Sequence, residues 1–228
     1  MVEAPQPKEP TMANGSDFKP QGSYSAPTLQ SQYVLKTEQA QQVHRRCFEG
    51  AARALYTVDV IARALAHRNN AFSHADVMKA VESLILKLEK EISDERDRFV
   101  AILKAAGQEG MVARYDNAAT FTFTISTPLI MRLAHIIQSF DEMLVQAQTA
   151  WLLGVLPSDR NDMTGNERKR QLMRVVRKLQ AMATDARAKA RKSPDAAEIA
   201  RTVGEVGEEN ALDQQTAAAV SELDAAAA

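Results

Sequence analysis

The chain has 228 residues, in which 28 lysines and arginines stand against 29 aspartates and glutamates, for a formal net charge of -1. This length suits one good-sized domain with tails or two small domains, and the total charge indicates neither a histone-like nor a polyanionic protein. The single cysteine, Cys47, excludes a disulfide framework and a cysteine-cluster zinc site. No run of 18 apolar residues and no signal-peptide pattern occurs, so we expect a cytoplasmic protein with no membrane partner.

The charge is unevenly distributed along the chain. Residues 160–192 carry 11 basic and 3 acidic side chains, whereas residues 193–228 carry 1 basic and 8 acidic ones. Residues 33–159 are nearly neutral, with 14 basic and 15 acidic side chains. One segment can therefore bind a polyanion although the whole chain is close to neutral.

The first 32 residues hold five of the eight prolines, together with glycine, serine and glutamine. This composition is typical of a disordered arm. The short apolar run 33–35 that follows is compatible with a strand, but three residues are too few to define one. We expect residues 193–228 to form a second solvated segment, acidic and mostly disordered, because their alanine-rich end has no apolar stripe to bury.

Two long helices are predicted between residues 37 and 107. The first begins after Thr37 as N-cap and shows an apolar residue every three or four positions as far as Leu65. The second begins at the Ser73 and Asp76 capping box and continues the same periodicity to Gly107. Because the connection between them is short, residues 33–118 are predicted to form an antiparallel helical hairpin.

The clearest strand of the sequence covers residues 119–125. Here three threonines alternate with three large apolar residues: Thr120, Thr122 and Thr124 with Phe121, Phe123 and Ile125. In an extended strand the hydroxyl groups would lie on one face and the apolar groups on the other. An ordinary solvent-facing strand would show the same threonines, since threonine is a good strand former.

A helical segment follows this strand. Thr127 and Pro128 have the pattern of an N-cap and a first helical residue, and Ser139 with Glu142 has the spacing of a second capping box. Residues 119–157 are therefore predicted to be strand, helix and helix, although one continuous helix over 128–153 is the alternative. A lone strand needs a partner for its backbone groups. We expect the same strand of a second subunit to supply it, in an isologous homodimer.

Such a pairing would leave a two-stranded ribbon with a threonine face toward solvent. A two-stranded ribbon fits the major groove of B-DNA, and threonine can contact base edges through its hydroxyl and methyl groups. We therefore predict that Thr120, Thr122 and Thr124 read bases, and that the backbone at Ser139 contacts a phosphate at a helix N-terminus.

The strand, helix, helix order resembles the ribbon-helix-helix DNA-binding fold. The wider chain resembles the AcaB family of transcriptional regulators carried by conjugative plasmids and integrative conjugative elements, over residues 33–180. The resemblance is carried by Tyr33-Val-Leu-Lys-Thr before a long helix, by Phe123-Thr-Ile-Ser-Thr-Pro-Leu, and by Phe140-Asp141-Glu142. It implies a dimeric, sequence-specific activator of conjugative-transfer genes that binds double-stranded DNA and acts with RNA polymerase or another regulator.

The basic helix predicted over 158–192 adds candidate phosphate contacts, and two isolated arginines lie near the strand. The full set is Arg114, Arg132, Arg168, Lys169, Arg170, Arg174, Arg177 and Lys178. Phosphate contact is one interpretation of this cationic excess, and docking to the chain's own acidic tail is the other.

Nothing in the sequence predicts catalysis. No glycine-rich phosphate loop is present, and no nucleophile lies at a recognised spacing from a base. His67, His74 and Asp76 match no metal-ligand spacing, so we expect no metal and no cofactor. The fold class predicted is mainly α with a short β-ribbon, built from a long helical hairpin and a ribbon-helix-helix-like unit. The functional alternative to a DNA-binding regulator is a non-enzymatic helical scaffold or assembly protein of a conjugative element.

Overall fold

The structure is a computed structural model that describes residues 27–68 and 72–226. Its elements are β1 (Leu29–Leu35), α1 (Glu38–Val43), the π-helical turn η1 (His44–Phe48), α2 (Glu49–Arg68), α3 (His74–Ala105), β2 (Ala119–Ile125), α4 (Pro128–Leu152), α5 (Ser158–Lys192), α6 (Ala196–Val203), the 3-10 turn η2 (Gly204–Gly207) and α7 (Ala211–Ala226). The predicted fold class, mainly α with a short β-ribbon, is confirmed. Within the described residues, no helix is both long and apolar enough to cross a membrane.

The ribbon is formed within one chain. β1 and β2 pair antiparallel over seven residues each, from Leu29 opposite Ile125 to Leu35 opposite Ala119. The prediction that β2 pairs with its copy in a second subunit is therefore wrong. The partner strand joins the weak strand candidate 33–35 to residues 29–32 of the predicted disordered arm, whose Leu-Gln-Ser-Gln sequence lacks the apolar alternation that marks β2. Residues 1–26 of the predicted arm lie outside the described part of the chain.

Each strand leads into a helix through a threonine N-cap. Thr37 precedes α1, and its hydroxyl accepts a hydrogen bond from the Ala40 backbone N–H at 3.4 Å. Thr127 precedes α4, whose first residue is Pro128, as expected for a residue without a backbone N–H. α4 then continues without a break to Leu152, as in the alternative of one continuous helix. Residues 119–157 therefore form a strand followed by one helix, and not the predicted strand and two helices.

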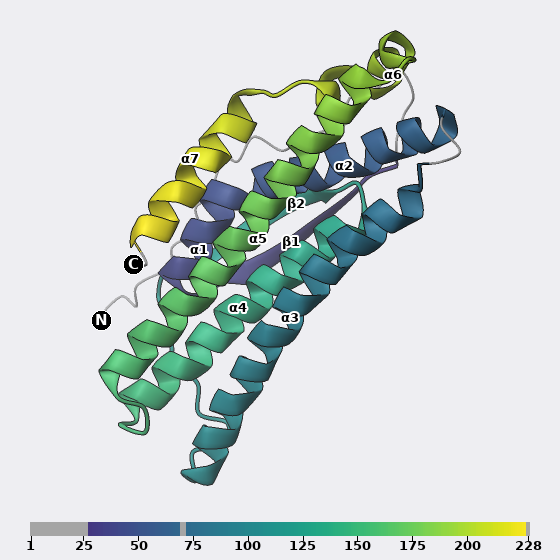
Figure 1. The fold of residues 1–228 in the computed structure, drawn as a ribbon. Coiled ribbons are helices and arrows are strands. Elements are labelled where there is room, and N and C mark those ends of the chain that lie inside the picture. Colours follow the sequence, from purple (N-terminus) through teal and green to yellow (C-terminus); the bar gives the residue numbers. More distant parts are fainter. Residues whose placement is uncertain (1–26, 69–71, 227–228) are drawn as a thin grey trace.

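The long helices pair across the molecule rather than with their neighbours in sequence. α3 packs mainly along α4, and α2 packs mainly along α5 (Figure 1). The two helices of the predicted hairpin, residues 33–118, follow each other in the chain as expected, but they have few contacts with each other. Their apolar stripes agree with the sequence pattern, but the helices that cover them, α5 and α4, belong to a later part of the chain.

The chain contains two equivalent units that pair with each other like the two subunits of a dimer, and we call this arrangement a pseudo-dimer. Each position of β1 and its N-cap has a counterpart 90 residues later, as Leu29 has in Ala119 and Thr37 in Thr127. The first unit is β1, the α1–η1–α2 helix and α3, and the second is β2, α4 and α5. The strands pair with each other, and the first helix of each unit packs on the second helix of the other. This is the reciprocal contact pattern of a two-fold interface, formed here within one chain.

The acidic C-terminal segment is helical and packed, which corrects the prediction that it is mostly disordered. α7 lies against α5, η1 and α2 and buries Val220 and Leu223, while α6 buries Ile199 and Val203. Gly50 permits this approach, because a Cβ atom built there would lie 1.9 Å from Thr216 Oγ1. Two buried apolar residues per helix give only a weak periodic pattern, so the sequence did not predict that these helices pack on the core.

Candidate nucleic-acid interface

The outer face of the ribbon is polar and accessible. Three cross-strand pairs form it: Gln30 opposite Thr124, Gln32 opposite Thr122 and Val34 opposite Thr120. Gln30, Gln32, Val34 and Thr122 are exposed, whereas Thr120 and Thr124 are half-buried. The three threonines predicted to read bases therefore share one outward face.

The inner face of the ribbon is clamped by aromatic packing. Tyr33, Phe121 and Phe123 are buried, and they surround His44 and Phe48 of η1 with ring-centroid distances of 4.2 to 6.4 Å. The Tyr33 hydroxyl and His44 Nδ1 form a buried hydrogen bond. Burial lowers the pKa of His44 to about 4, with a smaller effect from Arg45, so the imidazole is neutral at pH 7. This packing holds the outer face in a fixed orientation.

A buried carboxylate ties α4 to the turn between β1 and α1. Asp141 accepts hydrogen bonds from the Thr37 backbone N–H and hydroxyl, both at 2.7 Å, and from the Lys36 backbone N–H at 3.0 Å. The role predicted for Ser139 is therefore wrong: it lies in the middle of α4, where its N–H is not at a helix N-terminus, and the neighbouring Asp141 faces the core. The equivalent contact at Thr127 is absent, and its hydroxyl is buried without a hydrogen-bond partner in the structure.

Two cations that the sequence reasoning did not select lie beside the ribbon. Lys36 directly follows β1 and is exposed, and none of the described residues forms an ion pair with it. The Arg45 guanidinium carbon lies 5.5 Å from the centroid of the Phe121 ring, so Arg45 is next to an aromatic side chain of the inner face of the ribbon. Lys36 directly follows the apolar run 33–35, which is a signal in the sequence, whereas Arg45 lies in η1, away from both strands in sequence, and has no such signal.

The arginines predicted near the strand have different surroundings. Arg114 is exposed before β2 and has no ion-pair partner within the described chain. Arg132 in α4 pairs with Glu82 of α3 at 3.1 Å, across the contact between the two units. Arg132 is thereby engaged in a contact that holds α3 against α4.

Several predicted phosphate contacts of α5 are not accessible. Lys169 is only 7% exposed and lies beside Arg46 and Cys47, where burial lowers its pKa. The Arg168 guanidinium is largely buried and pairs with Glu95 of α3 at 2.9 Å. Both side chains stabilise packing between helices, so the prediction that they contact phosphate is wrong.

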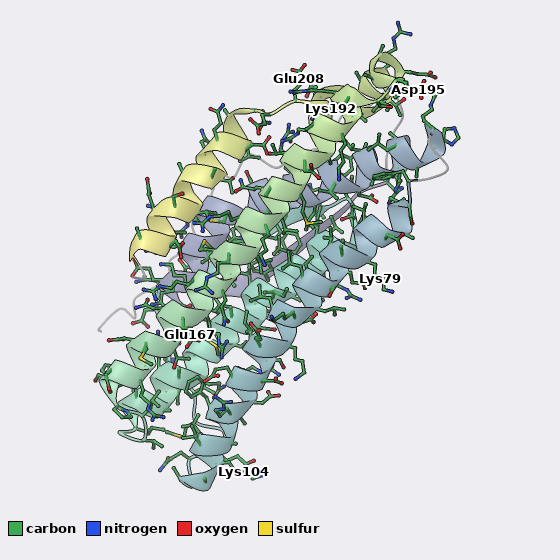
Figure 2. The ribbon with its side chains drawn as sticks, viewed as in Figure 1. Lys79, Lys104, Glu167, Lys192, Asp195 and Glu208 are labelled. Carbon is green, nitrogen blue, oxygen red and sulfur yellow. The ribbon has the colours of Figure 1, made fainter. Side chains whose placement is uncertain are left out.

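The remaining cations of α5 form an exposed stripe. Arg174 and Lys178 are exposed and Arg170 is half-buried, and none of the three has an ion-pair partner in the described part of the chain. Arg177 pairs with Asp224 of α7 at 3.1 Å, so the acidic tail does contact the basic helix there. Figure 2 labels Lys192, Asp195 and Glu208 at the other end of α5, where the chain turns into α6 and η2.

The α5 stripe and the ribbon do not form one surface. Figure 1 shows β1 and β2 behind α4 and α5, while the buried face of α5 packs toward α2 and α4. The exposed side of α5 therefore points away from the outer face of the ribbon. The single interface expected from the sequence, combining the threonines with the basic helix, is not formed.

The described residues contain no group of three or more histidine, cysteine, aspartate or glutamate side chains that could hold a metal ion. His74 instead contacts Asp59 at 2.8 Å, between α3 and α2. Cys47 lies in the core, 3.7 Å from the Met173 sulfur, and burial raises the pKa of its thiol to about 12.

Comparison with known proteins gives one informative result. No protein-family model matches the chain, and no curated protein sequence matches it. Among solved structures, the crystal structure of selenomethionine-containing AcaB from uropathogenic E. coli is similar, with a TM-score of 0.69. The alignment covers 87% of this chain and 100% of that chain at 24% sequence identity. The chain has an AcaB-like fold. At this identity the similarity establishes the fold alone, and it extends over both βαα units.

Proposed function

We propose that this protein is a non-enzymatic, sequence-specific DNA-binding protein that regulates transcription of conjugative-transfer genes. The observation that carries the proposal is the outer face of the ribbon, where two antiparallel strands present amide, hydroxyl and methyl groups to solvent. A two-stranded ribbon of this width fits the major groove, in which these groups can distinguish base pairs.

The arrangement around the ribbon supports this proposal. The inner face is fixed by buried aromatic rings, and both ends of the ribbon are tied to helix N-termini, so the outward side chains are presented in a defined geometry. Lys36 and Arg45 provide positive charge beside it, which suits contact with flanking phosphates. The resemblance to the AcaB family supports the link to conjugative transfer and the direction of regulation, activation.

The first experiment is a gel-shift titration of the full chain against promoter fragments of a conjugative element, with a shuffled fragment as competitor. We expect a preferred fragment whose binding survives excess shuffled DNA. Equal competition by both DNAs would contradict sequence-specific binding. A reporter gene fused to the preferred promoter then distinguishes activation from repression.

Thr122→Ala tests the role of the ribbon, because Thr122 is exposed at the centre of the outer face. We expect binding to the preferred fragment to weaken by about 1–3 kcal/mol, while binding to shuffled DNA stays unchanged. Thr202→Ala, at an exposed position of α6, is the matched control. An equal loss on both DNAs would show that Thr122 does not read a base.

The alternative, a helical scaffold that uses residues 38–106 as a partner surface, has less support. In the structure the apolar faces of α2 and α3 are covered by α5 and α4, so the hairpin offers no continuous free apolar face within its described residues. A scaffold would show no site preference in the same gel-shift titration.

A further inference from the structure

We infer that one protomer recognises a non-palindromic DNA element, and that opposite ends of its ribbon read different halves of that element. This inference rests on the proposed function and specifies the class of DNA that it requires. It also adds two specificity-determining residues, Gln30 and Gln32, to the predicted threonines.

The pseudo-two-fold axis passes through the centre of the ribbon. In the observed register Gln32 lies opposite Thr122, and these two residues are also equivalent positions of the two units, 90 residues apart. A homodimeric ribbon would place the same residue twice at such a point. One chain therefore supplies the complete two-stranded reading surface that a homodimer builds from two copies.

The two ends of the ribbon differ in chemistry. One end presents Gln30 beside Thr124, whereas the other presents Thr120 beside Val34. A glutamine amide can donate and accept at once, which suits the N6 and N7 edge of adenine, whereas a valine side chain can make only apolar contact, as with the thymine methyl group. Identical ends would read a palindrome, but these ends cannot prefer the same bases.

The residues that flank the two ends of the ribbon also differ in charge. Lys36 and Arg45 of the first unit correspond to Ser126 and His135 of the second. Lys36 therefore places a positive charge where β1 ends, beside the Val34 and Thr120 pair, and Arg45 adds a second one in η1, next to Phe121. The flanking phosphates would be held more firmly at that end, which gives the complex a defined polarity on the duplex.

The structure also gives no reason for a second copy to complete the ribbon. The apolar inner face is already covered within the chain, since Tyr33, Phe121 and Phe123 are each at most 8% exposed. The sequence prediction required a homodimer because that face and the backbone of β2 lacked partners. Both partners come from the same chain.

The test begins with selection of bound duplexes from a random library by the full chain. We expect an enriched motif without two-fold symmetry, and one chain per duplex by native mass spectrometry. A palindromic motif bound by two chains would overturn this inference and leave the proposed function standing. Absence of any enriched motif would overturn the proposed function, and the inference with it.

Two variants then assign the halves of the motif. Gln30→Ala and Thr120→Ala change equivalent positions at opposite ends of the ribbon, and each is the control for the other. We expect each to lose preference in a different half, by roughly 5- to 100-fold against substituted bases there. Loss in the same half by both variants, or in both halves by either, would overturn the inference. Circular dichroism with thermal melting confirms that each variant is folded before its preference is scored.

Discussion

His44 shows how a single buried side chain connects the ribbon to the helices. It lies in the π-helical turn between α1 and α2, stacks on Phe48, and bonds the Tyr33 hydroxyl of β1. A π-turn inserts an extra residue into a helix and is common where a side chain must be redirected. Here it turns an imidazole toward the inner face of the ribbon, where it packs at 4.2 Å from the Phe121 centroid.

The stability of the protein should therefore fall at acid pH. Burial lowers the pKa of His44 from 6.5 to about 4 in the folded chain, so between these values the unfolded chain binds a proton that the folded chain does not. We expect this group to cost roughly 3 kcal/mol of the free energy of unfolding as the pH falls from 6.5 to 4, and nothing above 6.5. Urea unfolding at a series of pH values measures it.

His44→Gln keeps an acceptor for the Tyr33 hydroxyl and removes the titrating group. It should flatten the dependence of unfolding free energy on pH in this window, whereas the exposed substitution His135→Gln should leave it unchanged. An unaltered slope in His44→Gln would contradict the role given to His44.

At the scale of elements, the acidic tail is held by two buried arginines. Arg53 of α2 and Arg187 of α5 both pair with Asp213 of α7, at 3.3 and 3.0 Å, and their side chains are only 6% and 4% exposed. Both arginines also donate to backbone carbonyls of residues 205–208. Buried charges persist only when paired and hydrogen-bonded, so this cluster fixes the path of the tail across α2 and α5.

Removal of the shared carboxylate should release the tail. Asp213→Ala removes the carboxylate that two buried guanidinium groups share, for which we expect a loss of about 3–5 kcal/mol and rapid proteolysis after residue 193. Asp224→Ala removes an exposed pair with Arg177 and should cost at most about 1 kcal/mol. Similar melting temperatures for the two variants would contradict this assignment.

Across the whole molecule, the pseudo-two-fold arrangement separates the ribbon from the basic stripe of α5. Lys36 and Arg45 lie beside the ribbon, whereas Arg174 and Lys178 are exposed on α5, which packs mainly on α2 and not on the strands. The salt dependence of binding can distinguish these two cationic surfaces, because each phosphate contact changes the slope of log K against log salt by about 0.9.

We expect Lys36→Ala and Arg45→Ala each to reduce that slope by about one, on preferred and shuffled DNA alike. Arg174→Ala and Lys178→Ala remove the same charges from α5 and should leave the slope unchanged. A reduced slope in the α5 variants would instead show that the duplex reaches that helix, as the sequence alone had suggested. Fluorescence anisotropy between low and moderate salt provides the measurement.

The sequence by itself determined the local features. The alternation of Thr120 to Ile125 defined β2, the caps Thr37, Ser73 and Thr127 marked the starts of α1, α3 and α4, and the charge pattern separated a basic helix from an acidic tail. These features depend on neighbours within a few residues, so they can be read directly from the chain.

Only the tertiary structure decided which elements pair. β1 has little pattern of its own and is a strand because β2 supplies its hydrogen-bond partners from 84 to 96 residues away. The tail helices are ordered because two buried arginines pair with Asp213 and because Gly50 leaves room for Thr216. These are long-range contacts, which the local sequence does not reveal. One signal of the pseudo-dimer was present: Tyr33 to Thr37 and Phe123 to Thr127 both read apolar, any residue, apolar, any residue, threonine before a helix. Its meaning depends on long-range contacts, which pair β1 with β2 so that a single chain carries both halves of its own ribbon.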